Sequence, residues 1–93
     1  MKILIVEDEE ILARVLREKF EKEGFRVEVV MDGEAVFPAA RSFRPDLILL
    51  DLILPKKDGF TVLKELRDDP STGKIPVIVL SNLGEMEDIG RVL

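Results

Sequence analysis

Three short runs of consecutive apolar residues stand out along the chain, at residues 3–6, 47–50 and 77–80. Each run consists only of isoleucine, leucine and valine. An unbroken run of this length is typical of a strand buried on both faces, as in a parallel sheet covered by helices. Residues 26–30, Arg-Val-Glu-Val-Val, alternate between charged and apolar side chains and predict an edge strand instead.

The segment after the first run has the pattern of an amphipathic helix. Its apolar side chains recur at helical spacing, at Ile11, Leu12, Val15, Leu16 and Phe20. Glu9 and Glu10 suit the electropositive N-terminus of this helix, and Gly24 suits its end.

Two aspartates predict the starts of further helices. Asp32 is a candidate N-cap for a helix that extends to about Arg41. Asp58 is one for a helix whose apolar residues are Phe60, Leu63 and Leu66. Pro38 falls about one turn into the first of these. Because proline lacks a backbone N–H, we expect that helix to start late or to kink.

Strands and helices therefore alternate along the chain, and a fourth helical pattern runs from Met86 to Leu93. This order predicts an open α/β sheet with right-handed crossovers. We expect one domain, which spans residues 1–93.

Composition narrows the possible chemistry. The 93 residues include 19 acidic and 14 basic side chains, with a net charge of −5, and neither cysteine nor histidine. Disulfides, thiolate metal sites and histidine general bases are thereby excluded. The acidic balance argues against nucleic-acid and anionic-membrane partners, and no apolar stretch approaches the roughly 20 residues of a membrane span. We expect a cytoplasmic protein.

Polar residues follow three of the predicted strands. Glu7 and Asp8 follow the first, Asp51 follows the run 47–50, and Ser81 follows the last. The carboxyl ends of parallel strands share one edge of a sheet, and neighbouring strands lie about 5 Å apart, so we expect the three carboxylates to share one pocket. Clustered carboxylates suit a hard cation, with Mg²⁺ the best match, and an aspartate there can act as a nucleophile toward phosphorus.

Each of these residues also has a common structural role. An acidic pair after a strand often begins a helix, an aspartate often caps a turn, and a serine often caps the next helix. Their joint placement at three strand ends is what favours a functional site.

Three segments carry a family resemblance: Ile-Leu-Ile-Val-Glu-Asp-Glu at 3–9, Pro-Asp-Leu-Ile-Leu-Leu-Asp-Leu-Ile-Leu-Pro at 45–55 followed by Asp-Gly at 58–59, and Pro-Val-Ile-Val-Leu-Ser at 76–81. In this order and spacing the chain resembles the receiver domain of bacterial two-component response regulators. The resemblance implies a flavodoxin-like fold with strand order 2-1-3-4-5.

The resemblance also implies a role for each site residue. Asp51 would be the phosphoacceptor, Asp8 would bind Mg²⁺ directly, and Glu7 would bind it mostly through water. The backbone carbonyl of Ile53 would be a further metal ligand, and Ser81 would be the switch hydroxyl that turns toward the phosphoryl group. The donor would be a phosphohistidine on a sensor histidine kinase, so the chain would be a signalling phosphoacceptor and not an enzyme.

One departure from the family is large. The family pattern includes a fifth strand that ends in a lysine, an aromatic switch residue before that lysine, and a fifth helix, none of which these 93 residues contain. We therefore expect a C-terminally incomplete domain with strand order 2-1-3-4. Metal binding should be retained, phosphorylation weak and signalling output lost. The exposed fourth strand should favour a symmetric or domain-swapped dimer.

Two other hypotheses remain. The first is an inactive structural or engineered fragment of a flavodoxin-like fold that self-associates. The second, an enzyme acting on nucleotides or phosphate esters, is less favoured, because residues 7–10 are all acidic where a phosphate-binding loop needs glycines. A haloacid-dehalogenase-like site would need an aspartate at position 53, which is isoleucine.

Overall fold

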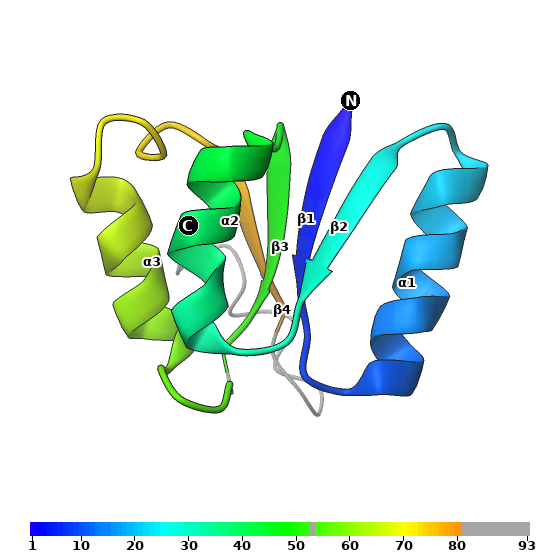
Figure 1. Ribbon diagram of the computed structural model, residues 1–93, viewed down its shortest axis with the longest axis horizontal. Coiled ribbons are helices and arrows are strands. Elements are labelled where there is room, and N and C mark those ends of the chain that lie inside the picture. Colours follow the sequence, from blue (N-terminus) through cyan, green and yellow to red (C-terminus); the bar gives the residue numbers. More distant parts are fainter. Residues whose placement is uncertain (53, 81–93) are drawn as a thin grey trace.

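All the strands predicted from the hydrophobic pattern are present in the computed structural model, which describes residues 1–52 and 54–80 (Figure 1). The elements in chain order are β1 (Lys2–Val6), α1 (Glu10–Lys22), β2 (Arg26–Val30), the 3₁₀ turn η1 (Gly33–Ala35), α2 (Val36–Phe43), β3 (Leu47–Asp51), α3 (Gly59–Asp68) and β4 (Val77–Leu80). The expected helix from Met86 to Leu93 lies outside the described residues.

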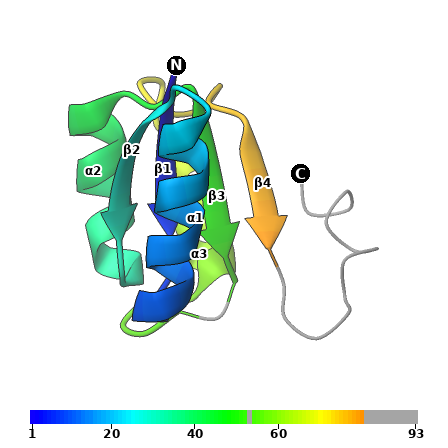
Figure 2. The same cartoon turned by 90° about the vertical axis from the view of Figure 1, so that its right-hand side faces the viewer.

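The strands form one parallel sheet in the order β2-β1-β3-β4. This confirms the predicted α/β class and the order 2-1-3-4. The register places Val6 beside Leu50, and Leu50 beside Val79, so the ends of the central strands lie level with one another. Helix α1 packs on one face of the sheet, and α2 and α3 pack on the other (Figures 1 and 2).

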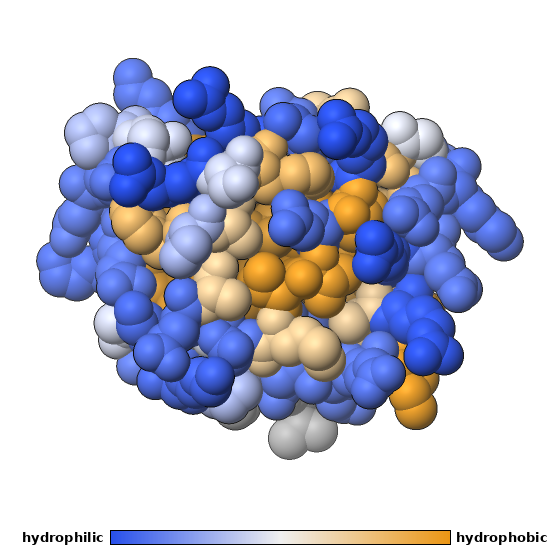
Figure 3. Space-filling model, viewed as in Figure 1, coloured by the Kyte–Doolittle hydropathy of each residue, from blue (hydrophilic) through white to orange (hydrophobic). Residues whose placement is uncertain are grey.

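Alternation along the strands divides the core into two layers. Leu4 and Val6 of β1 face α2 and α3, whereas Ile3 and Ile5 face α1, and all four are almost completely buried. In Figure 3, which has the view of Figure 1, apolar surface gathers at the centre, between α2 and α1, and is surrounded by hydrophilic side chains. Both faces of the central strands are therefore buried, as the unbroken apolar runs predict.

The layer under α1 is only partly covered by the described residues. Ile11 and Val15 of α1 are 75% and 53% exposed, although both belong to the predicted apolar pattern. Ile78 of β4 is 37% exposed, and in Figure 2 α1 lies over the β1–β2 side of the sheet and leaves β4 to one side. Apolar side chains of α1 and β4 thus remain accessible on one face.

The two predicted N-caps are present. The Asp32 side chain accepts a hydrogen bond of 3.0 Å from the Ala35 N–H at η1. The Asp58 side chain accepts one of 3.0 Å from the Thr61 N–H and one of 2.8 Å from the Thr61 hydroxyl at the start of α3.

Helix α2 starts late, as Pro38 predicts. A 3₁₀ turn follows Asp32, and Pro38 becomes the third residue of α2. The first N–H groups of a helix have no intrahelical acceptor, so the missing proline N–H costs nothing there. Among the described residues no helix has the length and apolar character needed to cross a bilayer.

Candidate functional site

Three carboxylates meet at the carboxyl edge of the sheet. Glu7 and Asp8 directly follow β1, and Asp51 is the last residue of its central neighbour β3. Each side chain offers an oxygen atom, and these three atoms lie within 4.8 Å of one another. The three carboxylates thus come together as predicted from the sequence, with Glu7 and Asp51 buried and Asp8 exposed.

Burial and like charge act together on Glu7. Burial raises the pKa of this carboxyl above its ordinary value, and the charges of Asp51 and Asp8 raise it further. A hydrogen bond of 3.0 Å from the Glu9 N–H acts in the opposite direction. A cation at this point would stabilise the ionised carboxylate by offsetting all the unfavourable contributions at once.

The ligand set fits Mg²⁺. Oxygen donors without sulfur or nitrogen suit a hard divalent cation, and Mg²⁺ in proteins is typically held by one or two carboxylates and several waters. Because Asp8 is exposed, water molecules can complete the coordination of a cation held here. Asp51 combines this position with a carboxylate oxygen that is chemically able to attack phosphorus.

Gly59 brings the start of α3 close to the end of β3. Its N–H donates a hydrogen bond of 2.9 Å to the Leu52 carbonyl. A Cβ at this position would lie 2.5 Å from the Leu52 Cα and 2.9 Å from the Asp51 carbonyl oxygen, so only glycine fits without a backbone shift. The Asp-Gly pair at 58–59 therefore combines a helix cap with a close approach to the acidic group.

Two predicted site residues lie outside the described residues. These are Ile53, whose carbonyl is the expected further metal ligand, and Ser81, the expected switch hydroxyl. Their roles stay predictions, as do the individual roles assigned to Glu7, Asp8 and Asp51.

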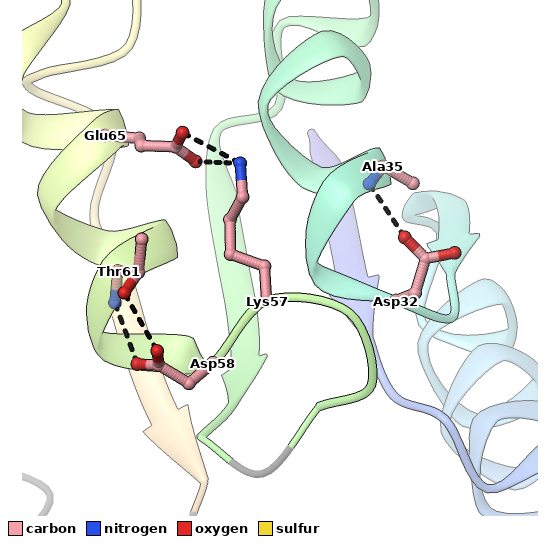
Figure 4. A network of polar contacts seen from close by, with 6 residues as sticks. All are labelled: Asp32, Ala35, Lys57, Asp58, Thr61 and Glu65. Atoms are coloured by element: carbon pink, nitrogen blue, oxygen red, sulfur yellow. Dashed lines mark hydrogen bonds and ion pairs between the residues drawn. The ribbon is translucent and has the colours of Figure 1, made fainter.

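Sequence reasoning missed a set of contacts that hold the loop between β3 and α3 (Figure 4). The Lys57 ammonium contacts both carboxylate oxygens of Glu65 on α3, at 3.0 and 2.8 Å. On the other side of the loop, Lys56 lies 3.6 Å from the Asp32 carboxylate. No local sequence pattern predicts these ion pairs, because the partners come from different elements. The sequence indicates only that two lysines, Lys56 and Lys57, lie close to Asp51.

Comparison with known proteins gives one consistent family. The profile of the response regulator receiver domain matches residues 3–93. The DNA-binding dual master transcriptional regulator RpaA of Synechocystis is 41% identical over 87 residues, which are 94% of this chain and 36% of that protein. The chain spans between 18% and 41% of the length of the curated relatives considered.

Solved structures agree with the sequence matches. The N-terminal domain of a response regulator receiver protein from Methanoculleus marisnigri is 30% identical with a TM-score of 0.87, and the match covers 97% of this chain and 73% of that one. The receiver domain of the sensor histidine kinase PA1611 from Pseudomonas aeruginosa is 32% identical with a TM-score of 0.85, and the match covers 94% of this chain and 71% of that one. That structure has a magnesium ion coordinated in its active-site cleft.

Proposed function

Because the chain belongs to the response-regulator receiver family of two-component signalling, we propose that it accepts a phosphoryl group on Asp51 with Mg²⁺ held by the acidic group. One observation carries the proposal: the Asp51 carboxylate ends a buried central strand within 4.8 Å of the carboxylate oxygens of Glu7 and Asp8. The neighbour whose structure contains magnesium in its active-site cleft supports the choice of cation.

The reaction is a phosphoryl transfer from a phosphohistidine of a sensor histidine kinase. An Asp51 oxygen attacks phosphorus, a P–O bond forms, the P–N bond to the donor imidazole breaks, and that nitrogen leaves with the electron pair and takes a proton from solvent. Bound Mg²⁺ would offset the negative charge on the phosphoryl oxygens and the carboxylates. Asp8 would hold the cation directly and Glu7 mostly through water.

Two further groups complete the proposal. The Ile53 carbonyl would be a metal ligand, and the Ser81 hydroxyl would turn inward to hydrogen-bond the phosphoryl group. The chain would take up one phosphoryl group per molecule and would act by changing partners, so it would not turn over a substrate as an enzyme does. We place this reaction in the cytoplasm, with no nucleic-acid or membrane partner for these 93 residues.

The 93 residues taken alone contain no counterpart of the family's lysine after a fifth strand. A lysine there would make a charge-assisted contact with the phosphoryl oxygens, worth about 1.5–3 kcal/mol. We therefore propose that a polypeptide of these 93 residues alone binds Mg²⁺ but is phosphorylated slowly.

The accessible apolar side chains of α1 and β4 support self-association. A second copy of this chain would cover Ile11 and Val15, and β4, which is an edge strand of the sheet formed by the described residues, would pair with its counterpart in a symmetric or domain-swapped dimer. Light scattering should show a dimer that Ile78→Lys weakens. Phe60→Lys, at a residue of α3 that is 58% exposed on the other face, should leave it unchanged, and a compact monomer at micromolar concentration would contradict this part of the proposal.

Phosphorylation is tested with phosphoramidate, a small phosphodonor, and Mg²⁺. Intact-mass spectrometry should show slow addition of one phosphoryl group, which Asp51→Asn removes and Asp68→Asn, at an exposed residue of α3, retains. Chelation with EDTA should stop the reaction. If the unmodified chain neither binds Mg²⁺ nor gains mass, the inactive structural fragment is the correct alternative.

A further inference from the structure

Lys57 lies where three separate segments of the chain meet. Its ammonium contacts Glu65 on α3 (Figure 4). Its N–H donates a hydrogen bond of 2.8 Å to the Pro55 carbonyl, and its own carbonyl packs against Gly33 of η1. A Cβ on Gly33 would lie 2.1 Å from the Lys57 carbonyl oxygen, so the two backbones are in close contact. One residue of the loop is thereby held from both sides.

The same loop connects the proposed phosphoacceptor to α3. It leaves β3 directly after Asp51, and its two ends are joined by the hydrogen bond from the Gly59 N–H to the Leu52 carbonyl. Its middle is joined to η1 by a hydrogen bond of 3.1 Å from the Gly33 N–H to the Pro55 carbonyl. Movement of Lys57 would therefore be transmitted to the backbone that follows Asp51.

The Lys57–Glu65 ion pair is poorly suited to a role in overall stability. Its side chains are 29% and 38% exposed, and ion pairs that reach solvent contribute little to folding. Its geometry is nonetheless restrictive, because one ammonium contacts both oxygens of the carboxylate. It also joins a loop to a helix across eight residues, so it limits the positions that the loop can adopt.

A second ion pair on the same helix provides a contrast. Lys64 and Asp68 lie 2.9 Å apart within α3, one helical turn from each other, with 76% and 65% of their side chains exposed. This pair joins the helix only to itself. The two pairs share a helix and a chemistry, and they differ in whether the loop after Asp51 is held.

We propose that Lys57 and Glu65 are positioning residues for the acidic site: their ion pair holds the loop that follows Asp51 in the arrangement that binds the divalent cation. The inference rests on the proposed function, since it concerns the Mg²⁺ affinity of that site. Without the pair, the loop samples more arrangements, and cation binding must supply the ordering.

The test is an NMR titration of the 93-residue chain with Mg²⁺ alone. Lys57→Met and Glu65→Gln should each weaken Mg²⁺ binding by about two- to fivefold, the range expected for a partly exposed ion pair. The double variant should be no weaker than either single variant. Lys57→Arg, which keeps the charge, should restore most of the affinity, and Lys64→Met should leave it unchanged.

Amide hydrogen exchange gives a readout that does not depend on the metal. The Gly33 N–H, which donates to the loop, should exchange faster in Lys57→Met than in Lys64→Met at equal unfolding free energy. If Lys57→Met fails to fold, Glu65→Gln is measured in its place.

The possible failures are distinguishable. An unmodified chain that binds no Mg²⁺ would refute the proposed function and this inference with it. If Lys57→Met and Glu65→Gln bind Mg²⁺ as tightly as the unmodified chain does, this inference is wrong and the proposed function stands. Equal losses in Lys57→Met and Lys64→Met would also overturn it, since they would trace the effect to general destabilisation of α3.

Discussion

Replacing Glu7 by glutamine should stabilise the metal-free domain while weakening its binding of Mg²⁺. Glutamine keeps the length of the side chain and an oxygen that accepts the hydrogen bond from the Glu9 N–H. It removes a negative charge from a side chain that is only 5% exposed. The variant therefore loses charge repulsion and the cost of charge burial, and keeps its packing.

The expected gain follows from the geometry of the acidic group. Two unit charges at the largest separation of its oxygen atoms, 4.8 Å, repel by about 0.9 kcal/mol in water and about 3.5 kcal/mol at an effective dielectric constant of 20. Asp51 is buried and Asp8 is exposed, so the environment lies between these limits. We expect Glu7→Gln to raise the unfolding free energy by about 1–3 kcal/mol at pH 7 without metal.

The gain should depend on pH in a definite direction. Burial, and then the charges of Asp51 and Asp8, raise the pKa of Glu7 in the folded chain above its ordinary value of 4.5. The folded state then binds the proton more tightly than the unfolded state, so the unmodified chain loses stability as pH rises from 4.5 through the folded pKa. The advantage of Glu7→Gln should be full above that folded pKa and vanish below pH 4.5.

Urea unfolding followed by far-UV circular dichroism is the appropriate assay, because the chain contains no tryptophan or tyrosine for fluorescence. Measurements in EDTA and in saturating Mg²⁺ separate the two effects, since a ligand stabilises only the form that binds it. Glu18→Gln, at an exposed residue of α1, is the control. If Glu7→Gln is no more stable than this control in EDTA, charge repulsion at Glu7 does not destabilise the domain. If Mg²⁺ stabilises the variant and the unmodified chain equally, Glu7 does not contribute to metal binding.

Three further variants test the supporting structure. Gly33→Ala should destabilise the domain by about 1–3 kcal/mol in thermal unfolding, because its Cβ would collide with the Lys57 backbone; unchanged stability would contradict the close contact. Thr72→Val should cost about 1–3 kcal/mol in urea unfolding, because the fully buried Thr72 hydroxyl donates a hydrogen bond of 2.7 Å to the Leu66 carbonyl, and a neutral result would show that water replaces it. Asp58→Ala should destabilise α3 at neutral pH by removing its N-cap. The Thr61 hydrogen bonds hold the pKa of Asp58 below its ordinary 3.8, so the stability difference between the variant and the unmodified chain should disappear as pH falls from 3.8 through the folded pKa. A stability difference that does not depend on pH would exclude the carboxylate as its cause.

Features that depend on neighbouring residues along the chain were predictable from the sequence. The apolar run at 77–80 became β4 without a change in its bounds, because its aliphatic residues favour a strand, but the predicted burial of both faces is wrong here, since Ile78 is 37% exposed. Asp58 could be identified as a cap because a capping side chain contacts backbone only a few residues away. The grouping of the three carboxylates was also predictable, since parallel strands bring their carboxyl ends to one edge.

The covered extent of a helix could not be predicted in the same way. Helical spacing places Ile11 and Val15 on the apolar side of α1, but the structure leaves both exposed and buries Ala13 instead. Phe60 also fits the apolar pattern of α3, yet α3 buries Val62 and leaves Phe60 exposed. Periodicity identifies the side of a helix that can be buried. The elements that pack against the helix determine how much of that side is buried.

The contacts around Lys57 were beyond local reasoning altogether. Its partner Glu65 is eight residues away on a helix, and its backbone neighbour Gly33 comes from another connection. Neither spacing follows a helical or strand repeat, so no sequence pattern marks them. Only the folded chain brings the loop after Asp51, the turn before α2 and the middle of α3 together.

The acidic group and its support follow from the same feature of the fold. Val6 and Leu50 are almost completely buried at the ends of the central strands, and the next residues in the chain are Glu7 and Asp51. The strands that contribute most to the core thus carry two carboxylates into a partly buried place, where their repulsion opposes folding. A divalent cation removes that repulsion, so cation binding and folding stability are coupled through the charges of the group. This coupling explains why a substitution that relieves the charge should raise stability and lower metal affinity together, whereas loss of the Lys57–Glu65 ion pair should lower metal affinity with little effect on stability.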